Sequence, residues 1–170
     1  MDDIAILVGP LIPPLRRYAR ALLRDRAAAD DLVQDCLERV ISRWHQRRAE
    51  GSTRTWVFTI LHNLAVNRLR ATARRGAHLA IEDVEIARPA SQEDALRHRD
   101  LLRALDTLSE EHRGLLLLIS VEDLSYSEAA KVLDVPIGTV MSRLARAREK
   151  LAAAMEGQPA PAQIHLRRVK

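Results

Sequence analysis

The segment from Leu124 to Leu151 restricts the fold more than any other part of the sequence. Ser125 and Glu128 have the spacing of a capping box, which starts a helix because the two residues satisfy each other's free backbone N–H groups. The turn Asp134–Pro136 ends that helix, since proline disfavours helix in the residue before it and suits the first turn of a new one. The segment therefore predicts a helix-turn-helix, whose second helix enters the major groove of DNA.

The second of these helices has separate apolar and polar faces. Its apolar residues are spaced by four, three and four positions, which predicts one buried side: Val140, Leu144, Ala147 and Leu151. The residues expected to contact DNA are Thr139, Ser142, Arg143, Arg146, Arg148 and Lys150. Basic side chains position such a helix on phosphates, and short side chains lie nearest the bases. The alternative is a solvated helical hairpin whose arginines are only surface charge.

Composition favours an all-α protein. Of the 170 residues, 47% are hydrophobic but only 3% are aromatic, so the core must consist of Leu, Ile, Val and Ala. The single cysteine, Cys36, excludes an internal disulfide and a multi-cysteine metal site, and we expect it to be a buried thiol. The longest apolar run, Leu115–Ile119, is too short to cross a bilayer and no signal peptide precedes it. We therefore expect a soluble cytoplasmic protein.

Charge divides the chain into blocks. Four acids and one base lie between Ala28 and Ile41, whereas five arginines and no acid lie between Thr53 and Gly76. From Gly76 to Ala95 five acids stand against one arginine, without helical periodicity. We predict a helical domain over 1–75, a flexible acidic linker over 76–95, a second helical domain over 96–156 and a disordered tail over 157–170.

A helix predicted to begin near Arg54 or Thr55 carries a second candidate DNA surface. Asn63, Asn67, Arg70 and Arg74 are spaced by four, three and four positions and so share one face. Carboxamides can hydrogen-bond bases while guanidiniums hold phosphates. An ordinary polar helix face is an equally open interpretation of this row.

Three segments follow one another along the chain: AADDLVQDCLERV, TRTWVFTILHNLAVNRLR and LSEEHRGLLLLISVEDLSYSEAAKVLDVPIGTVMSRLARAREKL. In this order and spacing they resemble the bacterial sigma-70 family, in its small extracytoplasmic-function (ECF) class, over roughly Leu11 to Leu151. The resemblance implies a transcription initiation factor. Its sigma2 domain would bind core RNA polymerase and open the promoter at the −10 element, and its sigma4 helix-turn-helix would recognise the −35 element.

The resemblance also implies roles for individual residues. Those that match the family's polymerase-docking segment are Asp30, Asp31, Leu32, Gln34, Asp35 and Glu38, with Leu32 and Val33 partly buried. The loop from Gln46 to Thr53, together with Asn63 and Asn67, matches the −10 base-capture site. The arginines expected to hold the single strand are Arg54, Arg68, Arg70, Arg74 and Arg75. The expected partners are core RNA polymerase, promoter DNA and an anti-sigma factor, with no cofactor and no metal.

Met141 departs from the family pattern, because members often have Lys or Arg at this position of the recognition helix. Methionine cannot donate a hydrogen bond to a guanine edge. We therefore expect readout of the −35 element to depend on Ser142, Arg143, Arg146 and DNA shape.

Other classes of protein explain less of the sequence. A sigma-mimicking adaptor, which sequesters an anti-sigma factor, usually carries a receiver domain and lacks the basic residues; this chain has no room for a receiver and keeps its arginines. A stand-alone helix-turn-helix regulator leaves the acidic segment and the Asn/Arg row unexplained. An enzyme fits least, since the six histidines lack metal-ligand spacing and no nucleophile lies in a recognisable setting.

Overall fold

The computed structural model describes residues 2–47, 51–75 and 92–157. Its helices are α1 (Asp2–Val8), η1 (Gly9–Leu11), α2 (Ile12–Leu23), α3 (Arg26–Ser42), η2 (Trp44–Gln46), α4 (Thr53–Arg74), α5 (Gln92–Asp106), α6 (Glu110–Ser120), α7 (Tyr126–Leu133) and α8 (Ile137–Met155). The described residues form no strand, which confirms the all-α prediction. Of the predicted linker, 76–91 lie outside the described residues and 92–95 belong to α5; the predicted tail is described only at 157.

Side-chain caps begin several helices where the sequence has Asp or Ser. Asp25 accepts a hydrogen bond from the Ala28 N–H at 2.8 Å and so starts α3. The predicted capping box starts α7, with Ser125 and Glu128 exchanging hydrogen bonds of 3.2 and 2.9 Å. Asp134 ends α7 with a φ of 53°, in the left-handed region that Asp tolerates better than most residues. The predicted helix-turn-helix is confirmed as α7 and α8.

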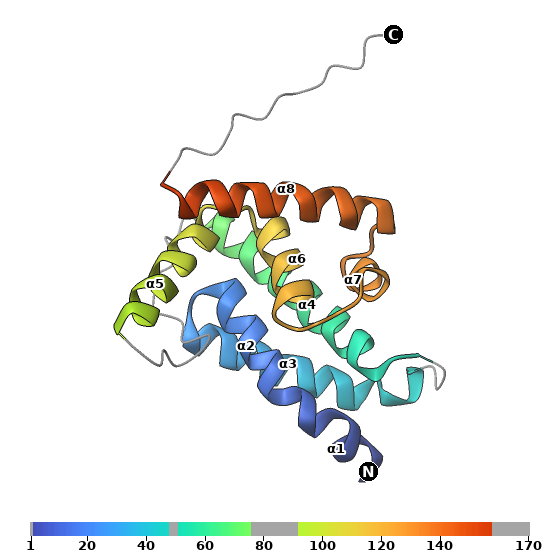
Figure 1. Cartoon of the computed structure of the whole chain (residues 1–170). Helices are drawn as coiled ribbons and strands as arrows, with labels where there is room; N and C mark the ends of the chain where they lie inside the picture. The colour runs from blue at the N-terminus through green and yellow to red at the C-terminus, as the bar shows by residue number, and fades with distance from the viewer. Residues whose placement is uncertain (1, 48–50, 76–91, 158–170) are drawn as a thin grey trace.

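One hydrophobic core joins the N-terminal helices α1–α4 to the C-terminal helices. Its C-terminal members are Leu117, Leu118, Leu124 and Val132, which pack with Tyr18, Phe58 and their neighbours. A smaller core around Leu115, Val140 and Leu144 holds α8 against α5, α6 and α7. In Figure 1, α8 lies on the opposite side of the molecule from α1–α3, with α6 and α7 between them. The N-terminal half (α1–α4) and the C-terminal half (α5–α8) therefore pack as one body, and the surface where they meet is called the junction.

Gly114 lets α6 approach α2 and α4 closely. A Cβ atom at this position would lie 3.2 Å from Tyr18 Oη and 3.5 Å from His62 Cε1. Tyr18 and His62 share a buried hydrogen bond of 2.9 Å between Oη and Nδ1. Burial lowers the pKa of His62 to about 4, so its imidazole is neutral at neutral pH.

The predicted packing role of Cys36 is confirmed. Its thiol is buried on α3 beside the Val57 carbonyl, and burial raises its pKa to about 12. A thiol with so high a pKa is a weak nucleophile at neutral pH. None of the described helices is long and apolar enough to span a membrane.

Candidate nucleic-acid and polymerase interfaces

The predicted −10 surface is an exposed face of α4. Asn63, Asn67, Arg70 and Arg74 are all exposed, as the helical spacing predicted. The other side of α4 is buried in the shared core, through Leu61, Leu64, Ala65 and Leu69 among others. Trp56 is half-buried and packs edge-on to Trp44, with ring centroids 6.1 Å apart.

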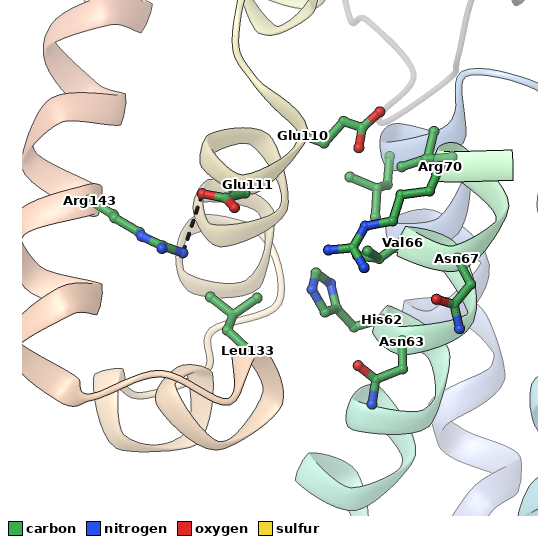
Figure 2. Close-up of a pocket in the computed structure, with 11 residues that line it drawn as sticks. His62, Asn63, Val66, Asn67, Arg70, Glu110, Glu111, Leu133 and Arg143 are labelled. Atoms are coloured by element: carbon green, nitrogen blue, oxygen red, sulfur yellow. Dashed lines mark ion pairs between the residues drawn. The ribbon is translucent and has the colours of Figure 1, made fainter. Parts of the chain in front are cut away.

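A cavity of about 370 Å³ separates this face from the C-terminal helices. Its lining includes His62, Asn63, Asn67 and Arg70 from α4, and Glu110, Glu111 and Arg143 from α6 and α8. Figure 2 shows Arg70 extending from α4 into the space between α4 and α6, near His62, with Glu111 on the opposite side. On the far wall, Arg143 pairs with Glu111 at 3.4 Å. Members of the predicted −10 and −35 sets thus line the same cavity.

Two of the arginines predicted to hold single-stranded DNA bind groups of the protein itself. Arg54 donates a hydrogen bond to the Glu122 carbonyl, and its guanidinium also lies 4.0 Å from the Glu122 carboxylate. Arg68 donates to the Ala28 carbonyl at 2.6 Å and lies 3.8 Å from the Asp31 carboxylate. Arg74 and Arg75, at the C-terminal end of α4, are exposed. Arg54 and Arg68 are therefore held by contacts inside the protein, whereas Arg74 and Arg75 are exposed at the end of α4.

The carboxylate of Glu122 is a structurally important group that the sequence analysis did not find. It is fully buried and accepts two hydrogen bonds from Arg17, at 2.8 Å from Nε and 2.7 Å from Nη2. Such a bidentate, charge-assisted pair is stronger and more directional than a neutral hydrogen bond. Arg17 belongs to α2 and Glu122 follows α6, so the pair joins the two halves. Its only signal in the sequence is an acid just after an apolar run.

Further polar contacts reinforce the junction between the halves. Thr55 on α4 donates to the Glu128 carboxylate on α7 at 3.1 Å. The pKa of Glu128 lies below its usual value, mainly because the Ser125 backbone N–H donates to the carboxylate. At the end of α2, Arg24 contacts the Asp106 carboxylate at 2.5 Å and donates to the Leu102 carbonyl at 3.2 Å. These contacts tie α2 and α4 to α5 and α7.

The predicted polymerase-docking residues lie on α3. Asp31, Gln34, Asp35 and Glu38 are exposed, and Asp30 is half-buried in an ion pair of 2.9 Å with Arg20. Leu32 and Val33, which were predicted to be partly buried, are each only 2% exposed and belong fully to the core. Because α3 packs against both α2 and α4, Leu32 faces the core and holds the helix in place. The exposed residues of α3 between Asp31 and Arg39 are all polar, and three of these five are acidic.

The predicted −35 residues lie on α8, whose inner side is buried through Val140, Leu144 and Ala147 as expected, whereas Leu151, also expected there, is half-buried. Ser142, Arg146 and Arg148 are exposed, and Thr139, Arg143 and Lys150 are half-buried. Two apolar residues also stand on the outer surface: Ile137 is 47% exposed and Met141 is 51% exposed. Met141 is marked by its departure from the family pattern, whereas no sequence pattern marks Ile137.

Similarity to known proteins identifies the family of the chain. The chain is 32% identical, over 158 residues, to the ECF RNA polymerase sigma factor EcfG of Rhodopseudomonas palustris (strain TIE-1), covering 89% of this chain and 82% of that protein. This chain belongs to the ECF sigma factors. Residues 98–151 of the sigma factor match the family described as sigma-70, region 4, and residues 8–62 match the sigma2 domain of PhyR. The resemblance seen in the sequence is confirmed.

Solved structures agree with this assignment. The sigma factor RpoE of Bartonella quintana, in complex with the anti-sigma factor NepR, has a TM-score of 0.77 and 28% identity to this sigma factor. The match covers 92% of this chain and 98% of that chain. The anti-anti-sigma factor PhyR of the same organism shares the fold, with a TM-score of 0.59 and 17% identity over 88% of this chain and 49% of PhyR.

Proposed function

We propose that this sigma factor binds core RNA polymerase through the exposed acidic residues of α3 and holds promoter DNA at two points. The face of α4 captures the opened −10 element, and the outer surface of α8 anchors the −35 element. In this proposal residues 1–75 act as the sigma2 domain and 96–156 as the sigma4 domain. The observation that carries the proposal is the exposed row Asn63, Asn67, Arg70 and Arg74. This row combines groups that read bases with groups that bind phosphates.

The proposed mechanism is a shift of the melting equilibrium. A base that leaves the duplex stack costs a few kcal/mol. Asn63 and Asn67 compensate by hydrogen-bonding the unpaired base, while the arginines of α4 bind the backbone of the single strand. Because these contacts form only with opened DNA, binding energy favours the open state. The protein then needs no catalytic group and no cofactor of its own, and it acts in the cytoplasm with RNA polymerase.

The packing of the two halves engages or surrounds some of the arginines of α4 that are proposed to bind the single strand. Arg54 is held by Glu122, and Glu110, Glu111 and Arg143 stand across the cavity from Arg70. Binding of the −10 strand therefore exchanges contacts inside the protein for contacts with phosphates. A partner that binds both halves together would favour the packed arrangement. We propose an anti-sigma factor for this role, because the similar RpoE is found in complex with one.

The similarity to PhyR supports a second candidate function, an adaptor that binds an anti-sigma factor in place of the sigma factor. An adaptor of that kind has no need of exposed arginines along α4 and α8. The arginines therefore favour the sigma factor. Reconstitution with core RNA polymerase on a promoter library separates the two functions, with run-off transcripts as the readout. The sigma factor predicts transcripts from specific promoters; their absence with an active core enzyme would contradict it.

A double substitution tests the α4 face directly. We expect Asn63→Ala with Asn67→Ala to reduce open-complex formation by about tenfold or more, because each good base contact contributes about 1–3 kcal/mol. Binding to core polymerase should be retained, since α3 is untouched. The measurement is open-complex formation by permanganate reactivity of unpaired thymines, beside a pull-down of the core enzyme. Arg16→Ala, which changes an exposed residue of α2, is the control. Unchanged open-complex formation in the double variant would exclude the base-capture role.

A further inference from the structure

The outer surface of α8 has an apolar flank that the proposed contacts with DNA do not use. Ile137 and Met141 are 47% and 51% exposed, and they are four residues apart, so their side chains lie one above the other. Ala145, four residues further on, is exposed as well. Apolar side chains are thus aligned along one side of the helix that is proposed to enter the major groove.

The rest of the outer surface divides into two other parts. Between the flanks lie small residues: Gly138, where an added Cβ would meet nothing within 4 Å, and exposed Ser142. On the side opposite the apolar flank lie Thr139, Arg143, Arg146 and Lys150, at the 3.6-residue period of one stripe. If the small residues face the floor of the DNA major groove, the basic flank lies against one DNA strand. The apolar flank then meets the base edges of the other strand.

We propose that Ile137 and Met141 read thymines of the −35 element through the 5-methyl groups that thymine presents in the major groove. This methyl is the apolar feature of the groove edges, and apolar side chains are its partners in direct readout. Arg143 pairs with the exposed Glu111 at 3.4 Å, so a contact from Arg143 to a guanine edge would have to replace that pair. The inference rests on the proposed function of α8.

Charge favours DNA over a protein as the occupant of this flank. Lys131 on α7 is exposed and lines the same groove as Ile137 and the exposed Asp134, and exposed Arg148 follows Met141 on the same side of α8. Two cations therefore stand against one acid beside the flank. These cations suit the phosphates on either side of a thymine. Two large apolar side chains also supply far less area than the roughly 800 Å² per partner of a stable protein interface.

The experiment removes a single methyl group from the DNA. The holoenzyme, reconstituted from core polymerase and the full chain, first selects its −35 element from a randomised duplex. Each thymine of the selected element is then replaced by uracil, one at a time. We expect one or two replacements to weaken binding by about three- to fivefold, the usual effect of losing one buried methyl group. Met141→Ala should lose this sensitivity, and Met141→Leu, which keeps an apolar contact, should retain it.

Met155→Ala is the matched control, because Met155 is 49% exposed on the same helix but near its C-terminal end. This variant should keep the sensitivity of the wild type to uracil. If uracil is tolerated at every position, or if Met141→Ala remains as sensitive as the wild type, the inference is overturned and the flank serves a protein partner. If the holoenzyme selects no −35 element at all, the proposed function fails, and the inference fails with it.

Discussion

The two proposed DNA surfaces differ in how they are connected to the rest of the protein. The α4 face adjoins the junction between the halves, where Arg54 binds Glu122 and Arg70 faces the glutamates of α6. The outer surface of α8 lies on the far side of the molecule, with Ser142, Arg146 and Arg148 exposed (Figure 1). Upstream anchoring by α8 is therefore compatible with the packed halves. Capture of the −10 strand by α4 requires that contacts inside the protein be exchanged.

The largest expected effect comes from the ion pair at the junction between the fully buried Glu122 carboxylate and Arg17, whose side chain is 38% exposed. Arg17→Met leaves the fully buried Glu122 carboxylate without its bidentate partner, and Arg54 at 4.0 Å compensates only in part. We expect the free energy of unfolding to fall by about 3 kcal/mol, the lower end of the effect of breaking a buried pair. Equilibrium unfolding in urea measures this change. Hydrogen exchange should increase more in α4 and α7 than in α8, which has its own core.

Two further variants isolate the pair. Arg16→Met changes the neighbouring exposed arginine and should leave the free energy of unfolding within about 0.5 kcal/mol of the wild type. Arg17→Met with Glu122→Leu replaces both charges by apolar groups and should recover most of the loss. Were Arg17→Met no more destabilising than Arg16→Met, the pair could not be what joins the halves.

A smaller effect is expected from His62, which lies beneath the α4 face. In the unfolded chain a histidine binds a proton near pH 6.5, whereas burial lowers the pKa of folded His62 to about 4. Between these values the unfolded state binds more protons, so stability falls as the pH is lowered from 6.5 to 4. We expect His62 to account for a loss of about 2 kcal/mol over this range. Urea unfolding at a series of pH values measures it.

His62→Gln should lack this part of the pH dependence, and the carboxylates titrate equally in both proteins. His45→Gln changes an exposed histidine in η2 and should behave as the wild type. If the stability of His62→Gln depended on pH as that of the wild type does, protonation of the buried imidazole would not be the cause of the loss of stability in acid.

The sequence predicted what depends on neighbouring residues. The capping box of Ser125 and Glu128 fixes the start of α7 locally, and helical spacing places Asn63 and Asn67 on one face whatever surrounds the helix. The pairing of Arg17 with Glu122 joins residues 105 positions apart, and only the packing of the halves brings them together. Leu32 shows the same limit. Periodicity identified its helix, but full burial depends on two further helices, α2 and α4, that cover it.

The smallest expected effect concerns the contact of α8 with the junction. Glu111→Gln removes the acid that pairs with Arg143 at 3.4 Å, and because Glu111 is 69% exposed the free energy of unfolding should change by less than about 0.5 kcal/mol. Arg143 is then available to DNA, so the holoenzyme should bind a −35 duplex about two- to threefold more tightly in low salt, and this gain should shrink as salt screens the charges.

Glu110→Gln makes the same change of charge one residue away on α6 and leaves the contact between Glu111 and Arg143 in place. A gain for Glu111→Gln but not for Glu110→Gln, measured by fluorescence anisotropy at several salt concentrations, would mean that the junction restrains α8 through Arg143. Equal gains would mean that only net charge matters. In that case contacts at the junction do not affect DNA binding by the outer surface of α8, whereas they do affect DNA binding by α4.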